Sequence, residues 1–431
     1  MALDVEAAPL AQLFSESPQP SIGTHAVDKV VHAIRDHLDM DVAFVSEFRK
    51  TDRVFRHVDA RDRSPIKPGD AAALENGYCQ RVVDGRLPQL MADTSRVAAA
   101  TELPETSAIP IGSHLSVPIR LSDGRVFGTL CCFSFTADPS LGERDLKVIR
   151  VFAELLADQL DRDVDGQRTR NEKTGHVMAA LAAGQPSIVY QPIFDLSTQR
   201  LAGLESLSRF EMEPRRPPDQ WFAEAAQVGM GVELELAAIR AALRALPAMP
   251  THTYLSVNCS PATIFSGELE QALAAADPRR IVLEITEHDT VEDYPMLLAF
   301  LAPLRAAGLR IAIDDAGAGY ASLRHVLHIQ PELIKLDVSL TRNIDSDAMR
   351  RALASALIAF ARESGARIVA EGVETEAELR TLKALGASCG QGYFLARPMS
   401  LVDSLRKPFP ASGGGADDGA MSHPAARSGQ R

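Results

Sequence analysis

From about residue 174 to residue 399, the sequence alternates short apolar runs with longer amphipathic segments. Short runs bounded by turn residues are typical of strands, and longer amphipathic segments are typical of helices. The candidate strands are SIVYQPIF, RLAGLESL, TYLSVN, IVLEIT, LRIAIDD, LIKLD, ARIVA and a short one at GYF. This pattern predicts a (β/α)8 barrel, for which about 225 residues is near the usual size. An open doubly wound sheet is the alternative, but its glycine-rich nucleotide fingerprint is missing.

The part of the chain before residue 174 has a different pattern of apolar residues. The segment AVDKVVHAIRDHL has apolar residues at helical spacing, and VAFVSEF, VFRHVDA, HLSVPIRL and RVFGTLCCFSF follow as β-rich runs. A helix leading into a mostly antiparallel sheet predicts an α+β domain of sensor size over residues 25–160. A chain of 431 residues has room for both domains.

A regular apolar repeat ends this first domain. Its members recur at intervals of 3, 4, 3 and 4 and are Leu146, Ile149, Ala153, Leu156 and Leu160. The repeat predicts a long helix and leaves two interpretations open. The helix either lies on the core of its own domain or forms a parallel coiled coil between two protomers.

Charged and polar residues fill positions 161–174, which predicts a helical linker or hinge before a barrel domain at residues 175–405. Residues 1–24 and 406–431 lack periodicity and are expected to be a disordered lead-in and tail.

Composition excludes several classes of protein. The formal net charge of -12 argues against a nucleic-acid partner, and no apolar stretch is long enough for a membrane span. Asp4 and Glu6 stand where a secretory signal would carry basic residues, so we expect a cytoplasmic protein. The five cysteines lack C-x-x-C spacing, which argues against a disulfide framework and a structural zinc site.

Polar residues stand at the ends of most candidate barrel strands. The carboxyl ends of parallel barrel strands converge on one face, where such enzymes build their sites. We therefore expect these side chains to lie close together: Glu205, Asn258, Glu284, Asp314, Asp315, Lys335, Glu371 and Gln391.

The residue types in this set indicate a metal site. Carboxylates and an amide oxygen, without His or Cys, suit Mg²⁺ or Mn²⁺. Asp314 and Asp315 are adjacent, and cations would compensate their repulsion, so two metals bridged by one carboxylate are expected. That layout suits phosphoester hydrolysis, with Lys335 orienting the attacking water and Glu371 acting as a further ligand or general base.

These residues occur within motifs that resemble a known family. YQPIFD, ESLSR, VNCS, LEITE, IDDAGAGYASL, IKLD, AEGVET and QGYFLARP follow one another in the order of the EAL domain, the cyclic di-GMP phosphodiesterase module of bacterial signalling. The resemblance covers about residues 185–398 and implies a TIM-like barrel. The implied reaction is hydrolysis of 3',5'-cyclic di-GMP to linear pGpG.

The resemblance also implies roles for individual residues. It assigns one Mg²⁺ or Mn²⁺ ion to Glu205, Asn258, Glu284 and Asp314, and a second to Asp314, Asp315 and Glu371. Lys335, Glu371 and Glu205 are the implied catalytic residues, with Lys335 holding the water. The implied substrate contacts are Gln191, Leu207, Arg209 and Gln391, the last of which also supports the metal ligands, and Glu287 is the implied loop anchor.

Two positions depart from the family's pattern. Ser206 replaces the usual Ala of the signature, a small-for-small change that keeps the neighbouring ligand. Ala316 stands where the family usually has Phe, in a loop thought to couple dimer contact to metal binding. The leading prediction is an active phosphodiesterase, and the alternative is a weak or inactive cyclic di-GMP receptor that signals to a protein partner.

The first domain resembles a GAF sensor module, most clearly in GSHLSVPIRLSDGRVFGTLCCFSF. We expect this domain to regulate the barrel in response to an unidentified small ligand or signal, and we expect the protein to be a homodimer. Four residues could carry haem, bilin or thiol chemistry, and we interpret each as an ordinary core or surface residue: Cys79, His114, Cys131 and Cys132.

Overall fold

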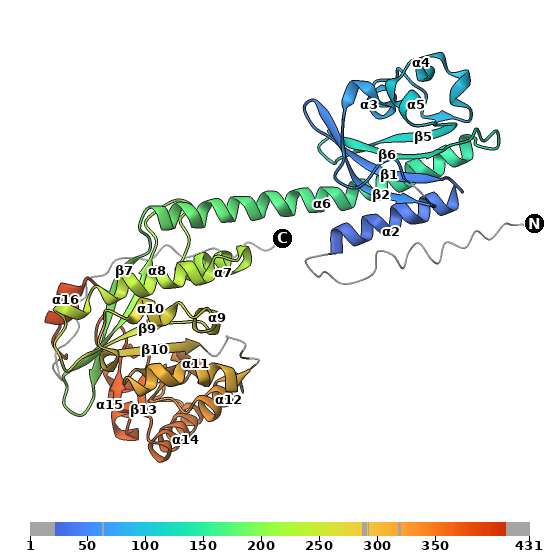
Figure 1. Cartoon of the computed structure of the whole chain (residues 1–431). Helices are drawn as coiled ribbons and strands as arrows, with labels where there is room; N and C mark the ends of the chain where they lie inside the picture. Colours follow the sequence, from blue (N-terminus) through green and yellow to red (C-terminus); the bar gives the residue numbers. More distant parts are fainter. Residues whose placement is uncertain (1–21, 63, 287–290, 292, 318–319, 411–431) are drawn as a thin grey trace, which may run out of the picture. The chain divides into compact units, whose positions relative to one another are not determined.

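The computed structural model describes residues 22–62, 64–286, 291, 293–317 and 320–410 (Figure 1). The chain divides into two compact units, residues 1–170 and 171–431. The predicted lead-in and tail lie largely outside the described residues, although helix α2 already begins at Ile22.

The first unit is built on a six-stranded antiparallel sheet. Its strand order is β3-β2-β1-β6-β5-β4. The strands are β1 (Val42–Phe48), β2 (Asp52–Ala60), β3 (Ala71–Ala73), β4 (Leu90–Met91), β5 (Ser113–Arg120) and β6 (Val126–Ser134). The helices are α2 (Ile22–His37), α3 (Tyr78–Val83), α4 (Ala98–Thr101), α5 (Pro104–Ala108) and α6 (Glu143–Ala182), with 3-10 turns η1 (Leu74–Asn76) and η2 (Thr94–Arg96).

Helices pack on both faces of this sheet and bury its apolar side chains. Successive residues of a strand point to opposite faces. Accordingly, Cys132 joins the apolar cluster under α2 and α6, while Cys131 joins the cluster under α3 and α4.

The apolar repeat of α6 lies on the core of its own domain. All five of its members belong to the cluster that α2 and the sheet form: Leu146, Ile149, Ala153, Leu156 and Leu160. The structure therefore favours the interpretation in which the repeat packs on the core of its own domain and not against a second protomer. Residues 161–174 continue the same helix, which ends at Ala182.

The second unit contains a closed eight-stranded barrel. Its order is β10-β11-β12-β13-β14-β7-β8-β9. The strands are β7 (Ser187–Asp195), β8 (Leu201–Arg209), β9 (Tyr254–Asn258), β10 (Ile281–Thr286), β11 (Arg310–Ala316), β12 (Leu333–Leu336), β13 (Arg367–Ala370) and β14 (Cys389–Gly390).

The predicted TIM-like barrel is confirmed, with two corrections. Strand β7 runs antiparallel to both of its neighbours, β8 and β14, because β7 and β8 form a hairpin. The last strand is Cys389–Gly390 and not GYF, since the backbone pairing with β13 and β7 involves Cys389 and Gly390.

Helices surround most of the barrel strands. They are α7 (Pro218–Val228), α8 (Gly231–Leu243), α9 (Pro261–Phe265), α10 (Leu269–Leu273), α11 (Tyr294–Ala306), α12 (Tyr320–Ile329), α13 (Val338–Thr341), α14 (Ala348–Ser364), α15 (Glu376–Leu385) and α16 (Leu401–Arg406), with 3-10 turns η3 (Leu246–Ala248) and η4 (Pro278–Arg280). No helix among the described residues combines the length and apolar character needed to cross a membrane.

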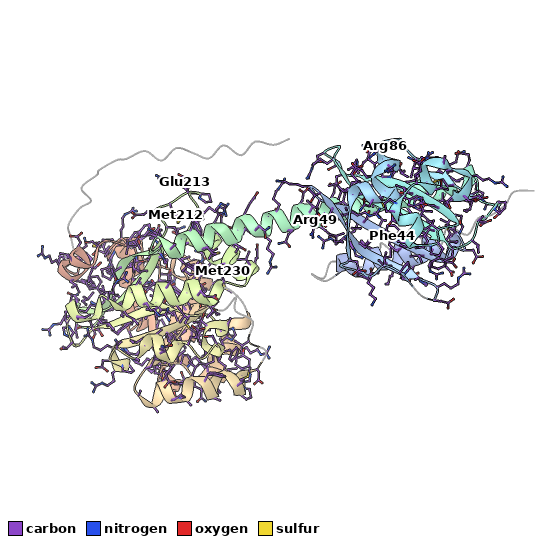
Figure 2. The ribbon with its side chains drawn as sticks, turned by 45° about the horizontal axis from the view of Figure 1, so that its top comes forward. Phe44, Arg49, Arg86, Met212, Glu213 and Met230 are labelled. Atoms are coloured by element: carbon purple, nitrogen blue, oxygen red, sulfur yellow. The ribbon has the colours of Figure 1, made fainter. Side chains whose placement is uncertain are left out.

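The main barrel core lies between the strands and the surrounding helices, and two smaller apolar clusters complete this unit. One forms a layer inside the barrel and consists of Ile193, Tyr254, Val282, Ala312, Leu333, Val369 and Cys389. The other joins the end of α6 to α7 and α8 around Trp221, with Met212 and Met230 packed against it (Figure 2). The final turns of α6 thus belong to the core of the second unit.

Candidate functional site

Six of the polar side chains predicted from the strand ends contact one another in a layer inside the barrel: Glu205, Glu284, Asp314, Lys335, Glu371 and Gln391. Five of them stand two positions after a residue of the apolar interior layer, and residues two apart on a strand share a face. The pairs are Val282 and Glu284, Ala312 and Asp314, Leu333 and Lys335, Val369 and Glu371, and Cys389 and Gln391. The local strand period thus places these groups above the apolar interior.

Lys335 lies at the centre of this layer. Its Nζ is 3.3 Å from Glu205 Oε1, 3.0 Å from Glu284 Oε2, 3.1 Å from Asp314 Oδ1 and 2.8 Å from Glu371 Oε1. Lys335 is 1% exposed. One buried ammonium therefore faces four carboxylates, and their charges exceed its own.

Two neutral side chains position the carboxylates. Gln391 Nε2 donates to Glu205 Oε2 at 2.7 Å and to Glu371 Oε1 at 2.8 Å. Ser256 Oγ donates to Glu284 Oε1. Because each bond fixes the orientation of a carboxylate, these contacts hold the layer in one arrangement.

Burial and the crowding of acidic groups shift the pKa values of this layer. Burial, followed by repulsion from Glu205 and Asp314, raises the pKa of Glu284 to about 8 against the attraction of Lys335. Burial also raises the pKa of Glu371 well above its ordinary value. Burial alone would lower the pKa of Lys335, but the surrounding carboxylates raise it well above its ordinary value. The layer is short of positive charge.

Two groups of carboxylates are close enough to hold metal ions. Glu205, Glu284 and Asp314 form one group, and Asp314, Asp315 and Glu371 form the other; ligand oxygens within each group lie within 4.8 Å of one another. Asp314 belongs to both groups. Asn258 ends the strand beside Glu284, its register partner, but its side chain is exposed.

A pocket of about 390 Å³ is lined by the residues that follow Glu205 on β8 and by the end of β9. Three of the predicted residues line it, Leu207, Arg209 and Asn258. Gln191 does not line this pocket; its Nε2 donates to Ala396 O at 3.1 Å, and its backbone register places it opposite Glu205. The structure thus brings Gln191 to the carboxylate layer.

The end of strand β11 has an unusual backbone. Asp315 has φ 55°, a left-handed conformation that is uncommon outside glycine. Ala316 is buried in the main barrel core. Gly317 has φ +107°, and a Cβ there would lie 2.2 Å from Leu340 Cδ1, so the turn requires glycine. Glu287, the predicted loop anchor, lies outside the described residues.

Sequence analysis missed two residues of the site. Ser256, which bonds Glu284, stands two positions after Tyr254 of the interior layer, so the strand period could have identified it. Glu235 lines the pocket and accepts hydrogen bonds from Ser260 N at 3.0 Å and Ser260 Oγ at 2.8 Å. Nothing in the local sequence of helix α8 marks Glu235.

Comparison with known proteins identifies both units. The model of the EAL domain matches residues 175–398, and the model of the GAF domain matches residues 24–161. The EAL match covers more than half of the chain, which therefore belongs to the EAL-domain family.

Several proteins of similar sequence are named as cyclic di-GMP phosphodiesterases. A cyclic di-GMP phosphodiesterase of Pseudomonas aeruginosa is 32% identical over 238 residues, which cover 51% of this chain and 40% of that protein. PdeN of Escherichia coli, a probable cyclic di-GMP phosphodiesterase, is 29% identical over 248 residues, covering 54% of this chain and 48% of that protein. The chain spans less than half the length of the curated relatives it matches.

A solved structure supports the fold of the chain. The EAL enzyme Bd1971 in its cGMP-bound form matches with a TM-score of 0.53 at 19% identity, covering 85% of this chain and 93% of that chain. At this identity the likeness concerns the fold alone.

Proposed function

We propose that this chain hydrolyses one phosphodiester bond of 3',5'-cyclic di-GMP to give linear pGpG, with two Mg²⁺ or Mn²⁺ ions as cofactors. Membership of the EAL-domain family and the names of the relatives support the substrate. The observation that carries the proposal is the pair of carboxylate groups that share Asp314 and are both contacted by a buried lysine.

The residues present fit two divalent cations. Four carboxylates contact a single ammonium, and burial together with repulsion from Glu205 and Asp314 raises the pKa of Glu284 despite Lys335. In the proposal one ion is held by Glu205, Asn258, Glu284 and Asp314, and the other by Asp314, Asp315 and Glu371. Such a pair of ions supplies charge stabilisation for the phosphoryl oxygens and an acidified water.

The protein's own groups then orient the reaction. Lys335 contacts members of both carboxylate groups, so its ammonium is placed to hold the attacking water at their junction. Glu371 accepts the proton of that water in this scheme. Gln391 bonds Glu205 and Glu371 together, which keeps both carboxylates oriented during the displacement.

The pocket beside the layer is the proposed substrate site. Arg209 lines it, and a guanidinium pairs bidentately with phosphate oxygens. Leu207 supplies an apolar wall for a base. Because both side chains project from β8, the strand that carries Glu205, they hold the substrate in register with the metal ligands.

The proposal includes regulation by the N-terminal unit within a homodimer. Helix α6 runs without interruption from Glu143 to Ala182 and contributes residues to the apolar clusters of both units. A continuous helix transmits rotation or displacement more faithfully than a flexible linker does.

The test is incubation of the purified chain with cyclic di-GMP and Mg²⁺ or Mn²⁺, followed by chromatography for pGpG. We expect product from the unaltered chain and none from Glu205→Ala. The matched control is Glu211→Ala, which removes an exposed acid just beyond the same strand and should leave turnover unchanged.

A different outcome would favour the second candidate function. Tight binding of cyclic di-GMP without turnover would identify a receptor, a role to which the small side chain of Ala316 points. In that case Ala316→Phe is the first variant in which turnover should be sought.

A further inference from the structure

Two cysteines meet in the core of the N-terminal unit. Cys79 on helix α3 and Cys131 on strand β6 are both 0% exposed, and their Sγ atoms are 3.6 Å apart. Disulfide formation requires the two sulfurs to approach to about 2.05 Å, a movement of about 1.5 Å. Of the five cysteines, only these two have a sulfur contact with each other in the described structure.

A buried arginine accompanies this thiol pair. Arg53 is 1% exposed and pairs with Glu105 through Nη2, while its Nε and Nη1 have no hydrogen-bond partner among the described residues. A Cβ at Gly77 would lie 2.2 Å from Arg53 Nη2, so glycine makes room for the guanidinium. An arginine with unused donors is a strong stabiliser of a neighbouring anion.

Arg53 and the Cys79 thiol face the same small cavity. Arg53, Cys79, His114 and Phe44 line it, with Phe44 marked in Figure 2. The cavity has about 10 Å³ of free space, enough for roughly one water-sized molecule. Large reagents are therefore excluded from Cys79, whereas a small oxidant reaches its thiol when the cavity opens slightly.

The environment distinguishes the two thiols chemically. Burial raises the pKa of Cys79, but the hydrogen bond with Cys131 and the charge of Arg53 outweigh it and bring the pKa below its ordinary value. Burial and the neighbouring Cys79 raise the pKa of Cys131. Cys79 is accordingly the nucleophile and Cys131 the resolving thiol.

We propose that Cys79 and Cys131 form a redox modification site, which hydrogen peroxide converts into an intramolecular disulfide. The Cys79 thiolate attacks one peroxide oxygen, the O–O bond breaks, and the departing hydroxide takes up the thiol proton to leave as water. Cys131 then attacks the sulfenic sulfur of Cys79; the S–O bond breaks, and the second hydroxide leaves with the Cys131 proton as water. Two thiols lose two electrons, and one peroxide is reduced to two waters.

Cys132 provides a matched control within the same strand. It neighbours Cys131 in sequence and is equally buried, but it lies in the cluster on the opposite face of the sheet. Burial raises the pKa of Cys132 well above its ordinary value, with Arg35 opposing only in part. Cys132 should remain reduced when Cys79 and Cys131 react.

The experiment treats the reduced full-length chain with hydrogen peroxide, then denatures it, alkylates the remaining thiols and maps tryptic peptides without reduction. We expect the alkylated cysteines to fall from five to three, with peptide 64–81 joined to peptide 126–144 until dithiothreitol separates them. Because Cys131 and Cys132 share the second peptide, variants assign the partner.

Each variant has a distinct expected result. Cys132→Ala should retain the cross-link, while Cys131→Ala should lose it and accumulate a sulfenic acid at Cys79 that dimedone traps. Circular dichroism checks that each variant is folded, and tandem mass spectrometry of the unaltered chain locates the bond independently. Five intact thiols after peroxide, or a cross-link that survives Cys131→Ala, would overturn the proposal.

Discussion

Lys335 shows how one side chain organises the barrel site. It is buried on β12, a strand whose other residues are apolar, and it contacts carboxylates from three strands and from Glu371, which directly follows a fourth. An ammonium in this position offsets part of the repulsion that burial makes costly. The same contacts place it between the two carboxylate groups, so its structural and proposed catalytic roles coincide.

Replacing Lys335 should lower the rate of hydrolysis and leave the affinity for substrate nearly unchanged. In Lys335→Met, saturating Mg²⁺ would take over the charge compensation of the carboxylates, so the remaining loss is the group that holds the water. We therefore expect kcat for cyclic di-GMP hydrolysis to fall about 100-fold or more while KM stays nearly constant. Lys383→Met, which removes an exposed lysine on α15, is the control. A change confined to KM would contradict the role given to Lys335.

Glu284 should give the metal-free protein a characteristic pH dependence. Its pKa is raised from an ordinary value of 4.5 to about 8, so the folded protein holds this proton more tightly than the unfolded chain. The stability contributed by this group is therefore lost as pH rises from about 4.5 to about 8. With a chelator present, the unfolding midpoint followed through Trp221 should decline over this range, and less steeply in Glu284→Gln; a rising midpoint would refute the assignment.

At the scale of elements, the two ends of helix α6 pack into two different apolar cores. Its first half carries an apolar face into the core of the N-terminal sheet, and its last turns contribute Val177 and Ala180 to the Trp221 cluster. The charged middle that sequence analysis interpreted as a linker remains helical. Solvated helical turns need no apolar face when both ends are anchored by packing.

Adjacent leucines of α6 test this arrangement. Leu156 is 1% exposed and Leu155 is 38% exposed. We expect Leu156→Ala to lower the free energy of unfolding of the N-terminal unit by about 2–5 kcal/mol, and Leu155→Ala by less than about 0.5 kcal/mol.

Denaturation followed by circular dichroism measures this loss in the full chain. Trp221 is the chain's one tryptophan and lies in the second unit, so its fluorescence should be unchanged by both substitutions. Equal effects of the two variants would mean that the repeat does not face its own domain.

For the whole molecule, the two units have separate cores, so we expect metal ions to change the thermal stability of one unit without changing that of the other. A ligand stabilises only the part that binds it, and both carboxylate groups belong to the barrel. Millimolar Mg²⁺ or Mn²⁺ should therefore raise the unfolding midpoint reported by Trp221 fluorescence and leave the N-terminal transition in place. Asp314→Asn, which alters the carboxylate common to both groups, should abolish the shift. An unchanged midpoint in the unaltered chain would argue against metal binding.

Much of the barrel site is encoded locally. A strand places every second residue on one face, so runs such as IVLEIT and LIKLD carry both an interior apolar residue and the polar residue above it. Strand period and strand end were therefore enough to predict Glu284, Lys335 and their partners, and the motif order indicated the family.

The features that the sequence did not predict depend on contacts between distant segments of the chain. The antiparallel direction of β7, the true last strand at Cys389 and the inward face of the α6 repeat follow from pairing and packing with residues far away in sequence. The contact of Cys79 with Cys131 spans 52 residues. Sequence alone determined which side chains each element offers, because local periodicity sets the faces of strands and helices. Only the tertiary structure decided which of those faces meet, because that choice minimises the free energy of the whole chain and not of any one segment.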